Sequence, residues 1–98
     1  MNYKVEFIKT AEKEYLALDN SQRMIIAKGI KKIMRLGTKA GVPLKGDLKG
    51  CYKIKARKAG LRIVYCQKDN AIEIMQIISI GKRDKLQVYL NASKRVKK

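Results

Sequence analysis

The chain has 98 residues, 46% hydrophobic and 33% charged, which is typical of one folded domain and excludes a disordered or fibrous protein. Its 24 Lys and Arg residues outnumber its 8 Asp and Glu residues, and the net charge of +16 indicates a polyanionic partner, nucleic acid first and an acidic protein second. No apolar run is long enough to span a membrane and the polar start shows no secretory signal, so we expect a cytoplasmic protein with no membrane partner.

The first half of the chain predicts one strand and two helices. Residues 3–8 alternate apolar and charged side chains, which is the pattern of a half-buried strand. Thr10 is suited to cap a first helix, and Asn20 or Ser21 is suited to cap a second, longer one. Gly37 follows the basic last turn of that second helix, as a C-terminal cap should.

The second half predicts three strands, at residues 51–57, 61–68 and 71–80, after a loop that concentrates Gly and the only Pro. Asp69 and Asn70 form a hairpin signal, and Asp84 can cap a short last helix before a basic tail at about 93–98. The whole order predicts a single α+β domain, residues 1–98. Its mostly antiparallel four-stranded sheet carries two N-terminal helices packed on one face and a short C-terminal helix.

The first two of these three strands have an amphipathic pairing register. Placing Tyr52 opposite Tyr65 makes one face apolar and sets Lys55 opposite Arg62 on the other face, together with Lys53. Like charges on one face repel unless an anion lies between them, so this cationic face predicts a site for RNA phosphates; a merely solvated face is the alternative.

The last strand of the sheet should continue both faces. Carried across the hairpin signal, the same register places Ile74 and Ile78 on the apolar face. It places Met75 and Ile77 on the cationic face.

Common metal-dependent and cofactor-dependent chemistries find no support in the chain. It has no His, its acids are scattered without a magnesium-binding cluster, and it lacks phosphate-binding glycine loops, so we expect no metal and no cofactor. Cys51 and Cys66 fall opposite each other in the predicted register but have no His to complete a zinc site. In a reducing cytosol we expect two free thiols. The alternative is a cross-strand bond formed on oxidation, which we expect to be incidental to function.

One reaction needs neither metal nor imidazole: the attack of an RNA 2′-hydroxyl on its own adjacent phosphate. The substrate brings its nucleophile, and Lys and Arg can stabilise the charge of the phosphorane. Among cations a phenol or an amine can act as the base, and Tyr89 in KRDKLQVY is the candidate phenol. The alternative for Tyr89 is that it only packs the last helix onto the sheet.

The segments LKGDLKGCYKIKARKAGLRIVY and IISIGKRDKLQVY resemble the RelE family of bacterial and archaeal toxins. The resemblance rests on a Leu-basic-Gly loop, then YKI-K-R, G-x-R-ϕ-V-Y, I-S-ϕ-G-K-R and a Tyr six residues on. It implies a ribosome-dependent mRNA interferase, a metal-independent endoribonuclease that cuts the codon in the ribosomal A site and so inhibits translation. The residues that match its catalytic set are Lys53, Lys55, Arg62, Arg83 and Tyr89.

The resemblance also implies roles and partners. Tyr89 would be the general base or stack on a nucleobase, and Lys53 and Arg83 would stabilise the phosphorane or protonate the leaving 5′-oxygen. Lys55 and Arg62 would hold phosphate. Further RNA contacts are expected from Lys45, Arg57 and Lys82. The expected partners are the ribosome, mRNA and an acidic RelB-like antitoxin, with a monomer when free and a hetero-oligomer with the antitoxin.

Two other functions compete with this one. A ParE-like toxin would have a similar fold but poison DNA gyrase without being an enzyme. A plain basic RNA-binding protein would use the cationic face for affinity alone. The set of Lys, Arg and Tyr residues favours the nuclease, since a gyrase binder has no need of it.

Overall fold

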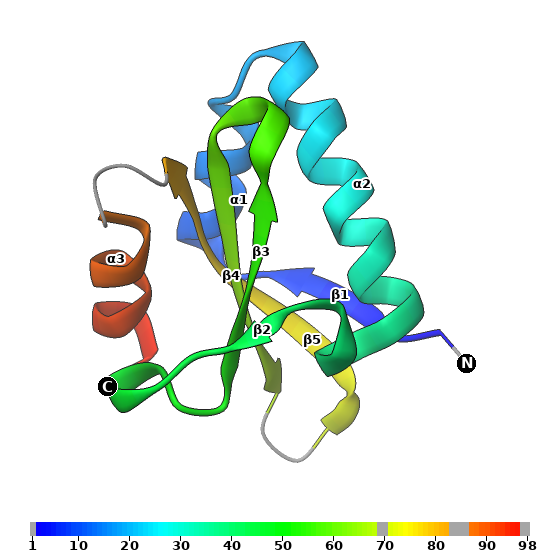
Figure 1. Cartoon of the computed structure of the whole chain (residues 1–98), viewed down its shortest axis with the longest axis vertical. Coiled ribbons are helices and arrows are strands. Elements are labelled where there is room, and N and C mark those ends of the chain that lie inside the picture. Colours follow the sequence, from blue (N-terminus) through cyan, green and yellow to red (C-terminus); the bar gives the residue numbers. More distant parts are fainter. Residues whose placement is uncertain (1, 69–70, 83–86, 97–98) are drawn as a thin grey trace.

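The computed structural model describes residues 2–68, 71–82 and 87–96. Five strands form one sheet in the order β1-β5-β4-β3-β2, as Figure 1 shows. The strands are β1 (Lys4–Phe7), β2 (Val42–Pro43), β3 (Cys51–Ala56), β4 (Leu61–Lys68) and β5 (Ala71–Lys82). The helices are α1 (Lys9–Leu16), α2 (Asn20–Leu36) and α3 (Gln87–Val96), with short 3₁₀ turns η1 (Gly37–Ala40), η2 (Gly46–Leu48) and η3 (Arg57–Ala59).

This architecture confirms the predicted α+β fold with a mostly antiparallel sheet. All four expected strands are present, and β1 is the one that pairs in parallel, along β5. The strand β2 adds a fifth within the expected loop, where two residues pair with β3. None of the helices in the described part of the chain is long and apolar enough to cross a bilayer.

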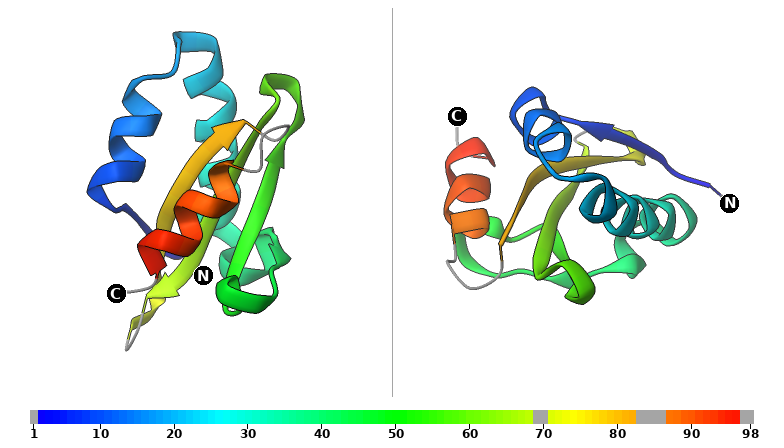
Figure 2. Two further views of the ribbon diagram at one scale, coloured as in Figure 1. Left: turned by 90° about the vertical axis from the view of Figure 1, so that its left-hand side faces the viewer. Right: turned by 90° about the horizontal axis from the view of Figure 1, so that it is seen from above.

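The helices divide between the two faces of the sheet (Figure 2). The helices α1 and α2 cover one face, where Ile26 and Ile33 of α2 pack with Ile63 and Tyr65 of β4 in the larger core cluster. On the opposite face α3 buries Val88 in a smaller cluster, beside the predicted cations. The expected tail is partly helical, because α3 continues to Val96.

The helix caps differ in part from those predicted. The first helix begins after Ile8 without a side-chain cap, so Thr10 lies inside α1. Asp19, rather than Asn20 or Ser21, caps α2: its Oδ1 accepts from the Gln22 amide at 2.8 Å, while its own amide donates to Gln22 Oε1 at 3.1 Å. The backbone hydrogen bond from Gln22 lowers the pKa of Asp19, since it favours the carboxylate.

Gly37 is the predicted C-terminal cap of α2, and the structure confirms it with a φ of 60°. A side chain there would also collide with Tyr3, whose ring lies 2.6 Å from the position a Cβ would take. The carbonyl of Gly37 accepts a hydrogen bond from the Tyr65 hydroxyl at 2.8 Å, which ties the end of α2 to the middle of the sheet. Burial raises the pKa of Tyr65 to about 12. The predicted hairpin at 69–70 and the Asp84 cap lie outside the described residues.

The predicted β3–β4 register is confirmed at every pair, including Tyr52 with Tyr65 and Lys55 with Arg62. The predicted register of β5 is wrong. Irregularities between Gln67 and Lys68 and between Val64 and Tyr65 shift the pairing of β4 with β5. A shift of the register by an odd number of residues moves the following side chains to the opposite face of the sheet. The side chains of β5 between the two irregularities therefore lie on the face opposite to the one predicted.

As a result Met75 and Ile77 face α1 and α2 in the larger core cluster. Ile78 lies in the smaller cluster beneath α3.

The expectation of two free thiols is also wrong. Cys51 and Cys66 form a disulfide between β3 and β4, with their Cα atoms 4.2 Å apart. Such a short separation is typical of cross-strand pairs that share no backbone hydrogen bond, where side chains lie closest. The predicted strand register already placed the two cysteines opposite each other, and the disulfide follows from that register. The expectation of free thiols was wrong because it was taken from the redox state of the cytosol and not from the geometry.

Candidate functional site

The cations of β3 and β4 gather on the sheet face that carries α3. Lys53 and Lys55 alternate with apolar residues along β3, and Arg62 pairs directly with Lys55. On the same face Val64 is fully buried beneath the helix. The cations therefore lie beside a part of the sheet that α3 covers, rather than across an open sheet.

Tyr89 joins these cations from α3. Its ring is half-buried against the smaller core cluster, and Lys53 Nζ lies 5.9 Å from the ring centroid. At that distance the ammonium is attracted to the electron-rich ring face. The fold thus brings a phenol from the end of the chain to a lysine of the central sheet, as the predicted site requires.

Arg62 contributes an unusual charged donor. Its Nη1 atom is buried, and no described residue accepts a hydrogen bond from it. A buried nitrogen of a charged group that makes no hydrogen bond is costly, and an anion that accepted from it would reduce that cost. The Oγ of Ser79 is also buried and has no hydrogen-bond partner among the described residues. Ser79 pairs with Val64, on the face that carries Arg62.

Gly81 allows α3 to come close to the sheet. It pairs with Arg62, and a Cβ at this position would lie 3.2 Å from the Cβ of Val88. That is tighter than ordinary van der Waals contact, so any larger residue would press the first turn of α3 away. Since Tyr89 follows Val88 directly, Gly81 helps to set the distance between Tyr89 and the sheet.

The other predicted site residues lie farther out. Lys45 is exposed ahead of η2, and Arg57 is exposed in the η3 turn between β3 and β4. Lys82 pairs with Leu61, whose side chain belongs to the larger core cluster, so strand alternation directs Lys82 away from the Arg62 face. Arg83 lies outside the described residues.

Several contributors were missed at the level of sequence. The buried donor of Arg62 and the close approach at Gly81 depend on how α3 packs, and α3 was expected only as a short helix. The available signal was the glycine within IISIGKR, since a glycine inside a strand often marks close backbone approach. Within the described ranges no three His, Cys, Asp or Glu side chains are grouped as they would be to hold a metal ion.

No family model matches the chain. Among curated proteins, a RelE-like toxin protein of Escherichia coli is 37% identical over 97 residues, which cover 99% of this chain and 100% of that protein. The chain belongs to the RelE family of toxins. A second relative of this RelE-family chain, the mRNA interferase toxin RelE of E. coli K12, is 33% identical over 96 residues, covering 98% of this chain and 99% of the relative.

Solved RelE structures show the same fold. A variant of E. coli RelE in the free state superposes with a TM-score of 0.81 at 33% identity, covering 97% of this chain and 98% of that one. The RelE chain in the intact E. coli RelBE toxin–antitoxin complex gives a TM-score of 0.71 at 31% identity, covering 85% of this chain and 99% of that one. The resemblance seen in the sequence motifs is therefore confirmed over the whole chain.

Proposed function

We propose that this chain is an mRNA interferase toxin that cuts mRNA in the A site of the ribosome and thereby inhibits translation. The observation that carries the proposal is that Lys53 lies beside the Tyr89 ring of α3, on the sheet face that also carries Arg62. Its relatives support it, because two of them are named mRNA interferases.

The reaction is an internal transfer within the RNA. The 2′-oxygen attacks the adjacent phosphorus, the bond from phosphorus to the 5′-oxygen breaks, and the products carry a 2′,3′-cyclic phosphate and a 5′-hydroxyl. One group must take the 2′-proton and another must protonate the 5′-oxygen. We assign the first role to Tyr89, which can also stack on a nucleobase from its half-buried position.

The cations divide the remaining work. Lys53, beside the Tyr89 ring, stabilises the phosphorane or protonates the leaving oxygen. Arg83 shares that task by family resemblance. Lys55 and Arg62 hold the phosphate, and the buried Nη1 of Arg62 supports this role because it lacks an acceptor among the described residues.

Outside this centre, Lys45, Arg57 and Lys82 would contact RNA phosphates at the periphery. Residues 1–98 act as one RelE-like domain with a basic end, free of metal and cofactor. The net charge of +16 suits rapid association with an acidic, RelB-like antitoxin, forming a hetero-oligomer from a toxin that is monomeric when free. We place the protein in the cytoplasm, where ribosomes translate.

The proposal is tested by primer extension on mRNA in a purified translation system. Lys53→Met should reduce cleavage within the A-site codon by at least a hundredfold, because a charge at the reacting phosphate is lost. The control Lys32→Met removes an exposed lysine from α2, in the opposite layer, and should cut like the wild type. An intact message combined with loss of gyrase supercoiling would instead indicate the ParE-like function. Equal cleavage by both variants would contradict the assigned site.

A further inference from the structure

The helix α3 must be held firmly if Tyr89 is to reach the phosphate. Val88, Ala92 and Arg95 fall at helical spacing, and the first two are fully buried against the sheet. Arg95 continues this inner stripe into the last turn. A guanidinium on the buried side of a helix needs partners, and these partners explain how the helix is fastened.

At the far end of α3 the apolar packing is incomplete. A hollow of about 320 Å³ lies there, bordered by Arg95 and Val96 of the helix and by the disulfide between Cys51 and Cys66. Val96 itself is 37% exposed. Polar contacts therefore have to hold this end of the helix.

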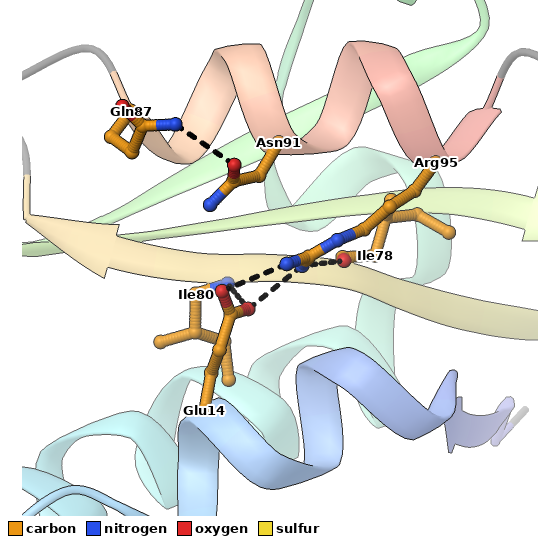
Figure 3. Close-up of polar contacts among 6 residues, drawn as sticks. All are labelled: Glu14, Ile78, Ile80, Gln87, Asn91 and Arg95. Carbon is orange, nitrogen blue, oxygen red and sulfur yellow. Dashed lines mark hydrogen bonds and ion pairs between the residues drawn. The ribbon is translucent and has the colours of Figure 1, made fainter.

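Those contacts come from Glu14 of α1 and from the β5 backbone, as Figure 3 shows. Arg95 donates from Nη1 to Glu14 Oε1 at 2.9 Å and from Nη2 to Glu14 Oε2 at 3.1 Å, which makes a two-pronged ion pair. Arg95 Nη1 also donates to the Ile78 carbonyl at 2.9 Å, while the Ile80 amide donates to Glu14 Oε1 at 3.0 Å.

These contacts lie where the ladder between β1 and β5 has ended. The pairing of β1 stops at Phe7 with Ile77, and Ile78 and Ile80 lie beyond it. Besides pairing with each other, Glu14 accepts a hydrogen bond from the Ile80 amide and Arg95 donates one to the Ile78 carbonyl, so two backbone groups that β1 does not reach have partners. Their side chains are only 25% and 20% exposed, so the pair is less screened than a surface salt bridge.

We propose that Glu14 and Arg95 form a latch that fixes α3 to the sheet and so holds Tyr89 beside Lys53. The proposal rests on the function proposed above. Both are positioning residues: Arg95 lies six residues beyond Tyr89, or about 9 Å along the helix axis, and acts on the reaction only through the helix. The other described tether from α3, a hydrogen bond from Ser93 Oγ to Asp47 Oδ2 at 3.2 Å, is exposed.

The test compares Arg95→Met with Lys94→Met. Both substitutions remove one positive charge from α3, but Lys94 is exposed and lies outside the latch. Hydrogen exchange of the α3 amides in the free protein should be at least tenfold faster in Arg95→Met than in Lys94→Met. Unchanged exchange would overturn the latch whether or not the protein cuts RNA.

The kinetic signature separates positioning from simple loss of charge. Relative to Lys94→Met, Arg95→Met should lower kcat by about 10- to 100-fold with little further change in KM, since small misplacements of reacting groups are costly. In a Tyr89→Phe background the same substitution should cause no further loss of kcat, because Arg95 acts through Tyr89. Independent, multiplying losses would contradict the proposal.

Arg95→Lys keeps the charge but not the two-pronged geometry, and should give intermediate exchange and kcat; it replaces Arg95→Met if that variant does not fold. If the wild type cuts no RNA, the proposed function fails while the latch is still tested. In that case the nuclear Overhauser contact between Lys53 and the Tyr89 ring should weaken in Arg95→Met and persist in Lys94→Met. A contact of equal strength in both variants would refute the latch.

Discussion

A charged guanidinium nitrogen buried without a hydrogen-bond partner normally destabilises a protein, and Arg62 Nη1 is such an atom within the part of the chain that the structure describes. Lys55 lies directly opposite Arg62 on the same face of the sheet. Keeping this arrangement makes physical sense if a phosphate takes the place of the missing acceptor. Arg62 then exchanges stability of the free protein for affinity toward RNA.

The effect of Arg62 on stability and on RNA affinity can be measured with Arg62→Met, which keeps the aliphatic length and removes the charge. We expect a melting temperature equal to or a few degrees above that of the wild type, because the buried nitrogen that lacks a hydrogen-bond partner is gone. Affinity for an uncleavable RNA should fall by at least tenfold, by filter binding. The control Arg35→Met, on the exposed side of α2, should alter neither property much. Strong destabilisation by Arg62→Met would show that the guanidinium is a structural group instead.

Tyr65 makes a prediction at alkaline pH. Burial raises its pKa from the usual 10.0 to about 12, so between these values the unfolded chain loses a proton that the folded chain keeps. The stabilisation by Tyr65 is therefore complete below pH 10 and is lost as pH rises to 12, by about 2 to 3 kcal/mol in total.

Urea unfolding at pH 9 and pH 11.5 measures this effect against Tyr65→Phe, which has no phenol to ionise. The wild type should lose more stability over that range than the variant does, although other Tyr and Lys residues titrate in both. Parallel losses in the two proteins would mean that the Tyr65 hydroxyl is not held in its neutral form.

Among the elements, the pair of β3 and β4 carries the site, and the disulfide between Cys51 and Cys66 joins its ends. The bond closes a loop with a sequence separation of 15. By restricting the unfolded chain, a loop of this length stabilises the fold by about 3 kcal/mol.

Reduction should therefore lower the unfolding free energy of the wild type by about that amount, measured by urea titration with and without a phosphine reductant. A variant with both Cys51→Ala and Cys66→Ala should not respond to the reductant. A wild type that is equally stable in both conditions would contradict a stabilising bond.

The elements also show how far the amino-acid sequence predicts this fold. The register of β3 with β4 was predictable because a one-residue slip would bury Arg62 among apolar side chains. The register of β5 was not, since the irregularities near Tyr65 and Gln67 leave no clear mark in the alternation. The strand β2 was missed because two residues are too few to show a period of two.

The candidate site was predictable to a similar degree. Residue types and strand alternation placed Lys53, Lys55 and Arg62 together, and the need for a base in a chain without His, together with the family motif, indicated Tyr89. What the sequence lacked was the packing of α3. The contacts of Arg95 with Glu14, and of Val88 with Gly81, join residues far apart in the chain and leave no local pattern.

Across the protein, the helices on the two faces of the sheet have different roles. The helices α1 and α2 supply the larger core on one face, which leaves the other face for cations and for α3. The net charge of +16 attracts the protein to RNA or to an acidic antitoxin. Repulsion among these charges also destabilises the folded state, and the apolar core and the disulfide offset that repulsion.

In the proposed reaction the RNA supplies its own nucleophile while side chains of this protein stabilise the reacting phosphate. The most direct test is a programmed ribosome whose A-site codon carries a 2′-deoxynucleotide on the 5′ side of the scissile phosphate. We expect the all-ribose codon to be cut, leaving a 2′,3′-cyclic phosphate by mass spectrometry, and the deoxy codon to stay intact although the toxin still binds. Cleavage of the deoxy codon, or no cleavage of the ribose codon, would rule out attack by the 2′-hydroxyl on the ribosome.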